Sequence, residues 1–339
     1  MRLSKKIVHT YIIAEAGVNH NGKLDVALEL CDEAKKAGAD AVKFQTWKTD
    51  LIITKKVCQA EYQKMNTGVE ESQYDMLRRL ELSYDDFREI KKHCDKIGIT
   101  FCSTADEAES LDFLIDLGIP FIKIGSGEIG NIPYLRYAGG KNLPIILSTG
   151  MSTYEDIDGS VNALVNAGAS DITLLHCTTS YPCEKKDVNL LAMKSLAEKY
   201  RVNVGYSDHT IGSEVAVAAV ALGAKVLEKH FTLDKNMPGP DHKASADIQE
   251  FAEYVRAVRD IEVSLGNPEK GPTLDEREIL KVVRKRVVAA REIYVGERFT
   301  EDNITVKRND EGELPSKWDE LLGMHAQKKY CVDDPIMIE

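Results

Sequence analysis

Residues 205–232 read GYSDHTIGSEVAVAAVALGAKVLEKHFT and hold two short apolar runs separated by an alanine-rich segment. Each run stops at a histidine, His209 in the triplet SDH and His230 in the triplet EKH. The pattern predicts a strand, a helix and a second strand, which is the repeating unit of a parallel sheet. The carboxyl ends of parallel strands meet at one edge of the sheet, so both imidazoles come together there. We therefore hypothesise that His209 and His230 bind a metal ion.

Six further apolar runs precede this unit, and each is followed by a helical pattern. The helix expected from about Leu24, for example, has apolar residues at Leu24, Leu28, Cys31 and Ala34. Eight strands that alternate with helices favour a closed (β/α)8 TIM barrel, an α/β fold, over an open sheet. The expected strands are 11–17, 40–47, 99–105, 121–128, 144–150, 172–178, 203–210 and 225–232.

Almost every expected strand begins apolar and ends in a chemically capable side chain. In a barrel the carboxyl ends of the strands surround one mouth, where the active site lies. A single lysine or histidine there is more often solvated or part of the core, and a single serine often caps the next helix. A functional role becomes the better interpretation when all these groups meet at one mouth, because lysines inside apolar strands are costly to bury without an anion. The strand-end groups are Glu15, Lys43, Gln45, Ser103, Lys123, Ser126, Glu128, Ser148, His176, Asp208, His209, Glu228 and His230.

Composition narrows the class of protein. Of the 339 residues, 43% are hydrophobic and 29% are charged, which is typical of a globular chain with a sizeable core. A net charge of -11 argues against nucleic acid as a partner, because phosphate-binding surfaces are basic. Seven scattered cysteines without a CxxC pair favour the reducing cytoplasm over a disulfide framework or structural zinc. No apolar run is long enough for a bilayer, and MRLSKKIVHT lacks a signal-peptide core.

The last part of the chain differs in character. A final barrel helix is expected at about 247–265, with Phe251, Val255 and Val258 on its apolar side. The stretch 266–281 begins rich in Gly and Pro and is interpreted as a linker. Beyond it, short β-like runs alternate with turns over a length that suffices for a small domain. The expected division is a catalytic barrel at 1–265, a linker at 266–281 and a small domain at 282–339.

Seven stretches carry a resemblance to a known family. AEAGVNHNG, VKFQT, KIGSGEI, PIILSTGM, LLHCTTSYP, VGYSDHT and EKHFTLDKNMPGPDHKAS follow one another along nearly the whole barrel. They resemble the sialic acid synthases, which include N-acetylneuraminate synthase and its legionaminate and pseudaminate relatives. The resemblance implies a transferase that condenses phosphoenolpyruvate with an open-chain 2-acetamido sugar of the mannose type. Water adds at C2 and phosphate leaves by C–O cleavage, which gives a nine-carbon 2-keto acid.

The resemblance also implies which ligands are bound. N-acetylmannosamine is the first expectation for the sugar, and 2,4-diacetamido-2,4,6-trideoxymannose, which leads to legionaminate, is the alternative. A divalent cation, most often Mn2+ with Mg2+ or Co2+ as substitutes, is implied at His209 and His230, with water and substrate oxygens completing its shell. Phosphoenolpyruvate is implied at residues whose ammonium and hydroxyl groups suit phosphate and carboxylate, namely Lys43, Lys123, Ser126, Ser148 and Ser207.

Further roles follow from the same motifs. Thr179 stands where the family has an asparagine that contacts phosphate, and a shorter hydroxyl replaces the amide there. Tyr181 and Asp241 are implied on the sugar side. Glu15 and Glu128 are implied as carboxylates that handle protons or sugar hydroxyls, with Lys123 as a catalytic cation. A carboxylate beside a lysine normally stays ionised, so Glu128 suits a base better than an acid.

Residues 284–308, RKRVVAAREIYVGERFTEDNITVKR, and the later LLGMHAQKKY resemble the antifreeze-like (SAF) domain of these synthases. A tail packed on its own barrel is the simpler reading of this segment. In the family the domain covers the barrel mouth of a partner subunit, which implies a homodimer with swapped C-terminal domains. An arginine of that domain contacts the acyl-amino group of the sugar, and Arg308 is its match. Residues 309–313, NDEGE, depart from the family's proline-glycine turn and add three acidic residues.

Two other functions remain open at this stage. A Schiff-base aldolase or lyase is one, since lysines inside barrel strands can form imines with pyruvate. It would work without metal and would be trapped by borohydride with its substrate. A non-catalytic sugar-binding protein on the same scaffold is the other, and it would bind the acylated sugar without releasing phosphate.

Overall fold

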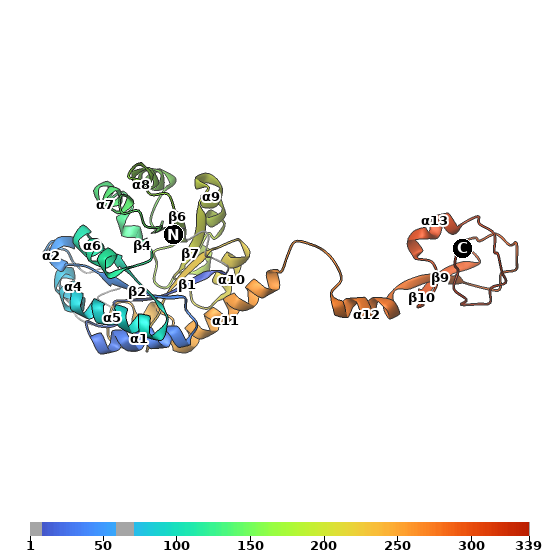
Figure 1. Cartoon of the computed structure of the whole chain (residues 1–339), viewed down its shortest axis with the longest axis horizontal. Coiled ribbons are helices and arrows are strands. Elements are labelled where there is room, and N and C mark those ends of the chain that lie inside the picture. Colours follow the sequence, from blue (N-terminus) through green and yellow to red (C-terminus); the bar gives the residue numbers. More distant parts are fainter. Residues whose placement is uncertain (1–8, 59–70, 339) are drawn as a thin grey trace. The chain divides into compact units, whose positions relative to one another are not determined.

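The computed structural model describes residues 9–58 and 71–338. Eight parallel strands form a closed barrel in which each strand pairs with the next and β8 pairs with β1 (Figure 1). The (β/α)8 barrel predicted from the alternating pattern is therefore confirmed. The strands are β1 (Tyr11–Gly17), β2 (Ala41–Thr46), β3 (Thr100–Ala105), β4 (Ile122–Ile124), β5 (Ile145–Ser148), β6 (Ile172–Cys177), β7 (Asn203–Asp208) and β8 (Val226–His230).

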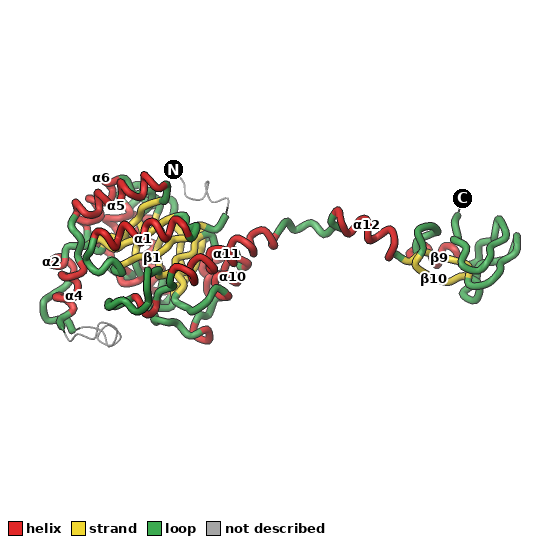
Figure 2. Tube along the Cα trace, turned by 90° about the horizontal axis from the view of Figure 1, so that it is seen from below, coloured by secondary structure: helices red, strands yellow, loops and turns green. Residues whose placement is uncertain are grey.

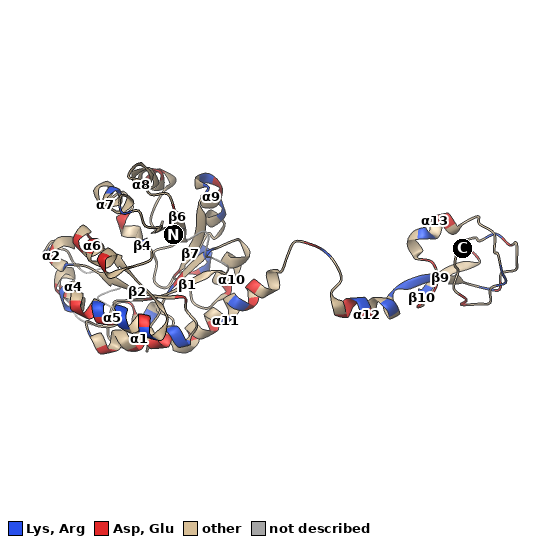
Figure 3. Cartoon of the chain, in the orientation of Figure 1, with Lys and Arg blue, Asp and Glu red and all other residues tan. Residues whose placement is uncertain are grey.

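Helices surround the barrel, and α1, α5 and α6 lie over the outer side of the strands (Figure 2). Acidic and basic residues alternate along the exposed sides of α5 and α11 (Figure 3). No helix of the described residues is long and apolar enough to cross a membrane. The helices of this unit are α1 (Leu24–Lys36), α2 (Thr49–Ile52), α4 (Gln73–Leu80), α5 (Tyr84–Ile97), α6 (Ala108–Leu117), α7 (Ile132–Gly139), α8 (Tyr154–Asn166), α9 (Leu191–Tyr200), α10 (Glu214–Ala221) and α11 (Ile248–Leu265).

The inside of the barrel is layered. A lower layer, which we call the barrel plug, is a cluster of fully buried apolar side chains. Six of the seven plug residues lie two positions before a polar residue, and Leu175 lies two positions before Cys177, so the alternation of a β-strand stacks the polar residues above the plug. The polar side chains above the plug therefore form the floor of the barrel mouth, because alternate residues of a strand point to the same side. The plug consists of Ile13, Ala41, Cys102, Phe121, Ile146, Leu175 and Val226.

One strand is shorter than expected. The run 121–128 was predicted as strand throughout, but β4 ends at Ile124 and Ser126–Glu128 forms the short 3-10 helix η2. The chain turns at Gly125, and Glu128 donates its backbone N–H to the carbonyl of that glycine at 3.2 Å. This turn moves Glu128 off the barrel axis.

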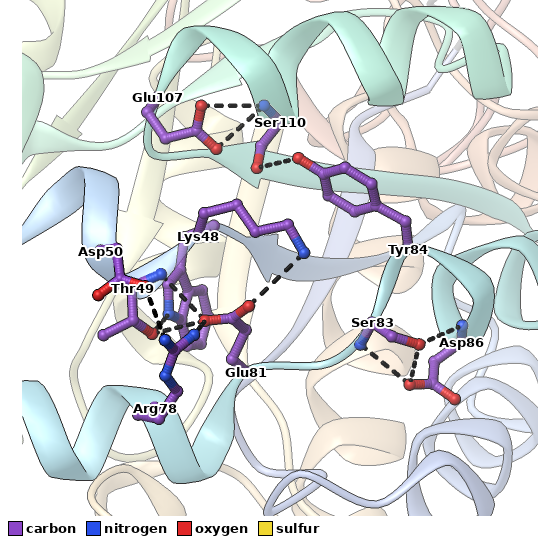
Figure 4. A network of polar contacts seen from close by, with 11 residues as sticks. Lys48, Thr49, Asp50, Arg78, Glu81, Ser83, Tyr84, Asp86, Glu107 and Ser110 are labelled. Atoms are coloured by element: carbon purple, nitrogen blue, oxygen red, sulfur yellow. Dashed lines mark hydrogen bonds and ion pairs between the residues drawn. The ribbon is translucent and has the colours of Figure 1, made fainter.

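A polar network fixes the segment that follows β2 (Figure 4). Glu81 accepts hydrogen bonds from the backbone N–H and the hydroxyl of Thr49, at 2.9 and 2.7 Å. Its carboxylate also pairs with Lys48 at 3.5 Å and with Arg78 at 3.2 Å. Lys48 lies over the ring of Tyr84 at 3.9 Å, which ties the segment to α5. The network anchors the segment that leaves the barrel after the end of β2 at Thr46.

Residues from Asn267 onward form a second compact unit. It contains the antiparallel pair β9 (Lys285–Ala289) and β10 (Ile304–Arg308), and its own apolar cluster includes Val287, Phe299 and Tyr330. The predicted linker 266–281 is not irregular throughout, because α12 (Leu274–Val283) begins within it behind a capping box at Thr273. The remaining elements are the 3-10 helices η3 (Lys185–Asp187), η4 (His242–Ala244) and η5 (Pro315–Lys317), and α13 (Trp318–Leu321).

Candidate active site

A cavity of about 210 Å³ lies above the barrel plug at the carboxyl ends of the strands. Ten of the thirteen residues to which the sequence gave a role line it, as do the strand-end residues Gln45 and Glu228. The ten are Glu15, Lys43, Lys123, Ser126, Ser148, Thr179, Tyr181, Ser207, His209 and His230.

Lys43 and Glu15 form a buried ion pair across β1 and β2. The ammonium nitrogen lies 2.8 Å from Oε2 of Glu15 and donates to Oγ1 of Thr104 at 2.9 Å. Gln45 donates to the other oxygen of Glu15 at 3.0 Å. Burial alone would lower the pKa of Lys43, but Glu15 and Glu228 outweigh it and hold that pKa above its usual value. Burial raises the pKa of Glu15 in spite of the opposing effect of Lys43.

Glu228 links the two buried lysines. Its Oε1 lies 3.5 Å from the nitrogen of Lys123, and its Oε2 lies 3.9 Å from that of Lys43. Ser207 donates to Oε1 at 3.1 Å. Burial would raise the pKa of Glu228, yet Lys123 and Lys43 prevail and lower it to about 2. The sequence marked Glu228 as a strand-end group but gave it no role, although it shares the inward face of β8 with His230.

Lys123 is surrounded by oxygen acceptors. Its nitrogen donates to Oγ of Ser148 at 2.8 Å and to the carbonyl of Ile124 at 3.2 Å. Burial lowers the pKa of Lys123, against the attraction of Glu228. Nearby, Ser126 accepts the backbone N–H of Gly150 at 2.9 Å. Two ammonium groups, the two carboxylates paired with them and several hydroxyls thus converge above the plug. The ammonium and hydroxyl groups are of the kind that bind a small polyanion.

His209 and His230 face one another with ring centroids 5.5 Å apart. Nδ1 of His209 lies 2.7 Å from the carbonyl oxygen of Thr178, which can only accept, so Nδ1 carries a proton and Nε2 is the atom left for a ligand when the ring is neutral. Burial would lower the pKa of His209, but its contacts with Cys177 and with the carbonyl of Thr178 hold that pKa above its usual value. Burial, assisted by His209, lowers the pKa of His230 to about 3 and keeps that ring neutral. The ring of Tyr181 lies against both imidazoles, at 4.2 and 5.5 Å.

In their neutral forms, the two imidazoles fit a divalent cation that keeps open positions for oxygen ligands. Among residues 9–58 and 71–338 no group of three or more His, Cys, Asp or Glu side chains is arranged to hold a metal. His209 and His230 would hold such a cation, and water and substrate oxygens would complete its shell.

Three predicted residues do not line the central cavity, and a fourth, Thr179, does. Glu128 accepts the side-chain amide of Asn131 at 2.6 Å and lines a neighbouring cavity of about 850 Å³ rather than the central one. Asp241 lies with Oδ2 4.0 Å from Nδ1 of His230, and burial raises its pKa to about 6. Arg308 ends β10 in the second unit and is exposed. Thr179 does line the central cavity, and its buried hydroxyl has no hydrogen-bond partner among the described residues.

Asp106 was missed in the sequence. It follows β3 directly and lines both the central cavity and the larger one beside it. Burial raises its pKa to about 7, and the nearby charge of Glu128 adds to the shift. Its position one residue past a strand that ends in polar groups was a usable signal.

Comparison with known proteins places the chain in a family. The model of the NeuB family matches residues 30–270, and that of the SAF domain matches residues 284–337. The N,N'-diacetyllegionaminic acid synthases of Legionella pneumophila and Campylobacter jejuni are 44% and 46% identical, over 97% and 96% of this chain and 94% and 98% of their own length. The crystal structure of the sialic acid synthetase of Leptospira borgpetersenii is 33% identical, with a TM-score of 0.70 over 81% of this chain and 91% of that one. The chain belongs to the NeuB family of phosphoenolpyruvate-dependent synthases, and it carries a C-terminal SAF domain.

Proposed function

We propose that this enzyme condenses phosphoenolpyruvate with the open-chain form of 2,4-diacetamido-2,4,6-trideoxymannose to give a legionaminate-type 2-keto acid and phosphate. N-acetylmannosamine, the first expectation from the sequence, is the second candidate acceptor. The preference for the diacetamido sugar is supported by the two legionaminic acid synthases, whose identity to this chain is 44% and 46%. A cytoplasmic location stays a prediction from the cysteine usage.

The observation that carries the proposal is the pair of buried lysines above the plug. Lys43 and Lys123 are 3% and 2% exposed, and each lies against a glutamate and a hydroxyl. Buried charges are expensive to maintain, so their retention calls for a function. A phosphate and a carboxylate on one small molecule would use both ammonium groups, with Ser126, Ser148 and Ser207 as neutral donors. Thr179 would contribute a hydroxyl from the next loop.

The reaction joins C3 of phosphoenolpyruvate to the sugar aldehyde carbon, adds water at C2 and expels phosphate from C2. Glu15 is the best-placed carboxyl to hold or move a proton, because it lies in the central cavity and burial raises its pKa. Tyr181 and Asp241 would orient the sugar near the imidazoles. Glu128 and Asp106 would face the sugar from the larger cavity.

A divalent cation, with Mn2+ first and Mg2+ or Co2+ as substitutes, would be held by His209 and His230. When bound, it would supply Lewis acidity toward the aldehyde carbonyl. The hydrogen bond from Nδ1 of His209 to Thr178 leaves Nε2 directed to that role. The functional unit would be a homodimer with swapped SAF domains, in which Arg308 contacts the acyl-amino group of the partner's sugar.

Release of inorganic phosphate tests the function. Phosphoenolpyruvate, Mn2+ and each of the two sugars are supplied in turn, and kcat/KM for the diacetamido sugar is expected to exceed that for N-acetylmannosamine at least tenfold. Lys123→Met should abolish release, whereas Lys141→Met, at an external pair with Asp112, should not. A higher kcat/KM with N-acetylmannosamine would transfer the assignment to the second candidate. Absence of release with both sugars would remove the catalytic proposal.

The Schiff-base alternative has one observation in its favour, since the pKa of Lys123 is lowered by burial as in imine-forming lysines. Borohydride reduction with pyruvate, followed by mass spectrometry of the intact chain, separates the two mechanisms. The synthase mechanism predicts an unmodified chain. A pyruvate adduct on Lys123 would favour the lyase.

A further inference from the structure

A second set of charged residues lies behind the histidine pair. Asp208 and Lys229 are direct partners in the register of β7 and β8, and they precede His209 and His230 by one residue each. Because side chains alternate along a strand, they point away from the cavity, toward the surrounding helices. Lys229 accordingly lies 5.1 Å from the ring centroid of Tyr254 on α11. Both are almost fully buried, at 1% and 6% exposure.

Their hydrogen bonds join the two histidine-bearing segments. Nζ of Lys229 donates to the backbone carbonyl of Thr210 at 2.6 Å and to Oδ2 of Asp208 at 3.2 Å. Oδ1 of Asp208 accepts the backbone N–H and the hydroxyl of Thr210 at 2.8 and 2.7 Å. The carboxylate thus bridges the backbone on both sides of His209. The ammonium connects that bridge to the residue before His230.

We propose that Asp208, Lys229 and Thr210 form a clamp that sets the separation and orientation of His209 and His230, and so determines the affinity of the site for a divalent cation. The three are positioning residues, since they do not face the cavity. The inference rests on the proposed metal site at the two histidines.

The chemistry of these residues favours this role over simple stabilisation. An apolar pair at 208 and 229 would join the strands to the helices without the cost of burying two charges. The strand ends at Asp208, and beyond it the carbonyl of His209 accepts the backbone N–H of Cys183 at 2.8 Å. The side chains of Asp208 and Lys229 add the hydrogen bonds that hold Thr210, on the other side of His209. Outer contacts that orient metal ligands typically change metal affinity by about 10- to 100-fold when removed.

The test titrates the full-length protein with Mn2+ alone and follows free Mn2+ by electron paramagnetic resonance. Lys229→Gln keeps a donor for Thr210 but loses the charge that holds Asp208. Its Kd for Mn2+ is expected to rise at least tenfold, while its Kd for phosphoenolpyruvate without metal changes less than twofold. The matched control is Arg259→Gln, which breaks an ion pair with Asp40 at 2.8 Å on the opposite rim and should leave the Kd for Mn2+ unchanged.

Each outcome decides the matter. An unchanged Kd for Mn2+ in folded Lys229→Gln, or an equal loss of Mn2+ and phosphoenolpyruvate affinity, would overturn the clamp. If Lys229→Gln does not fold, Thr210→Val removes one hydrogen bond from Asp208, and a threefold rise in Kd is then the supporting result and an unchanged Kd the contrary one. His209→Ala tests the metal site separately from the clamp. If this variant binds Mn2+ as tightly as the unaltered protein, the proposed metal site is wrong, and the clamp has no site to position.

Discussion

Replacing Glu228 by glutamine tests how the buried lysines are stabilised. The substitution preserves shape and the contact with Ser207 but removes a negative charge 3.5 Å from Lys123 and 3.9 Å from Lys43. At an effective dielectric constant of about 20, each attraction is worth roughly 4 to 5 kcal/mol. The recovered desolvation of the carboxylate offsets several kcal/mol of this, so we expect the free energy of unfolding to fall by about 3–5 kcal/mol.

Urea denaturation measures the effect. Trp47 is buried beside the barrel mouth and Trp318 lies in the second unit, so a Trp318→Phe background makes fluorescence report on the barrel. Phosphoenolpyruvate should stabilise Glu228→Gln more than the unaltered protein, because the variant offers an uncompensated positive charge to the phosphate. The control Glu81→Gln changes a less buried carboxylate in the network after β2 and should cost about 1 kcal/mol.

The pH dependence of stability provides a second test of the role of Glu228. The pKa of Glu228 is lowered to about 2 in the folded protein, so its stabilisation is present above the usual carboxyl pKa and is lost as the pH falls toward 2. Glu228→Gln should flatten the stability curve in that window. Two results together would refute the idea that Glu228 stabilises the buried lysines. One is a fall of less than about 1 kcal/mol in the free energy of unfolding of Glu228→Gln at pH 7, and the other is an unchanged pH dependence of stability in acid.

Three further predictions concern other parts of the barrel. The raised pKa of Asp106, about 7, means that its stabilisation is present below the usual carboxyl pKa and is lost as the pH rises through 7. Asp106→Asn should therefore gain roughly 4 kcal/mol relative to the unaltered protein at pH 8, measured by urea denaturation at pH 4 and 8. An equal difference at the two pH values would contradict it. Gly205→Ala should lower the free energy of unfolding by about 3 kcal/mol or more, because a Cβ there would lie 2.1 Å from the carbonyl oxygen of Val226. Thermal unfolding measures the effect, and a midpoint equal to that of the unaltered protein would show that β7 can move to accept the methyl group. Treatment with EDTA should abolish phosphate release, and Mn2+ should restore it; activity that persists in EDTA would rule out the metal at His209 and His230.

Much of the barrel could be predicted from the sequence because its signals are local. Each strand is a short apolar run before a polar group, and closure then brings these groups to one mouth without any knowledge of packing. Lys43, Lys123 and the two histidines were found in this way. The same rule, applied one residue beyond the end of β3, identifies Asp106.

Features that depend on turns, or on contacts between residues distant in the chain, could not be predicted from the sequence. Glu128 was expected at the central mouth, but the turn at Gly125 directs it to the neighbouring cavity. Glu228 has its importance only because Lys43 and Lys123, distant in the chain, converge on it. Helix α12 was hidden by the Gly and Pro residues that precede it, although Thr273 and Glu276 form a capping box.

The barrel plug has a consequence for the kinetics of the enzyme. Because Phe121, Ile146 and Leu175 help to seal the barrel below the charged layer, that layer is reached from the mouth alone within the described part of the chain. On the proposed function, the ligand that contacts Lys43 and Lys123 occupies the floor, and the sugar enters above it. The floor ligand cannot leave until the upper one has gone. Phosphoenolpyruvate should therefore bind before the sugar, excess sugar should not displace it, and inorganic phosphate should depart last and compete with phosphoenolpyruvate for the empty floor.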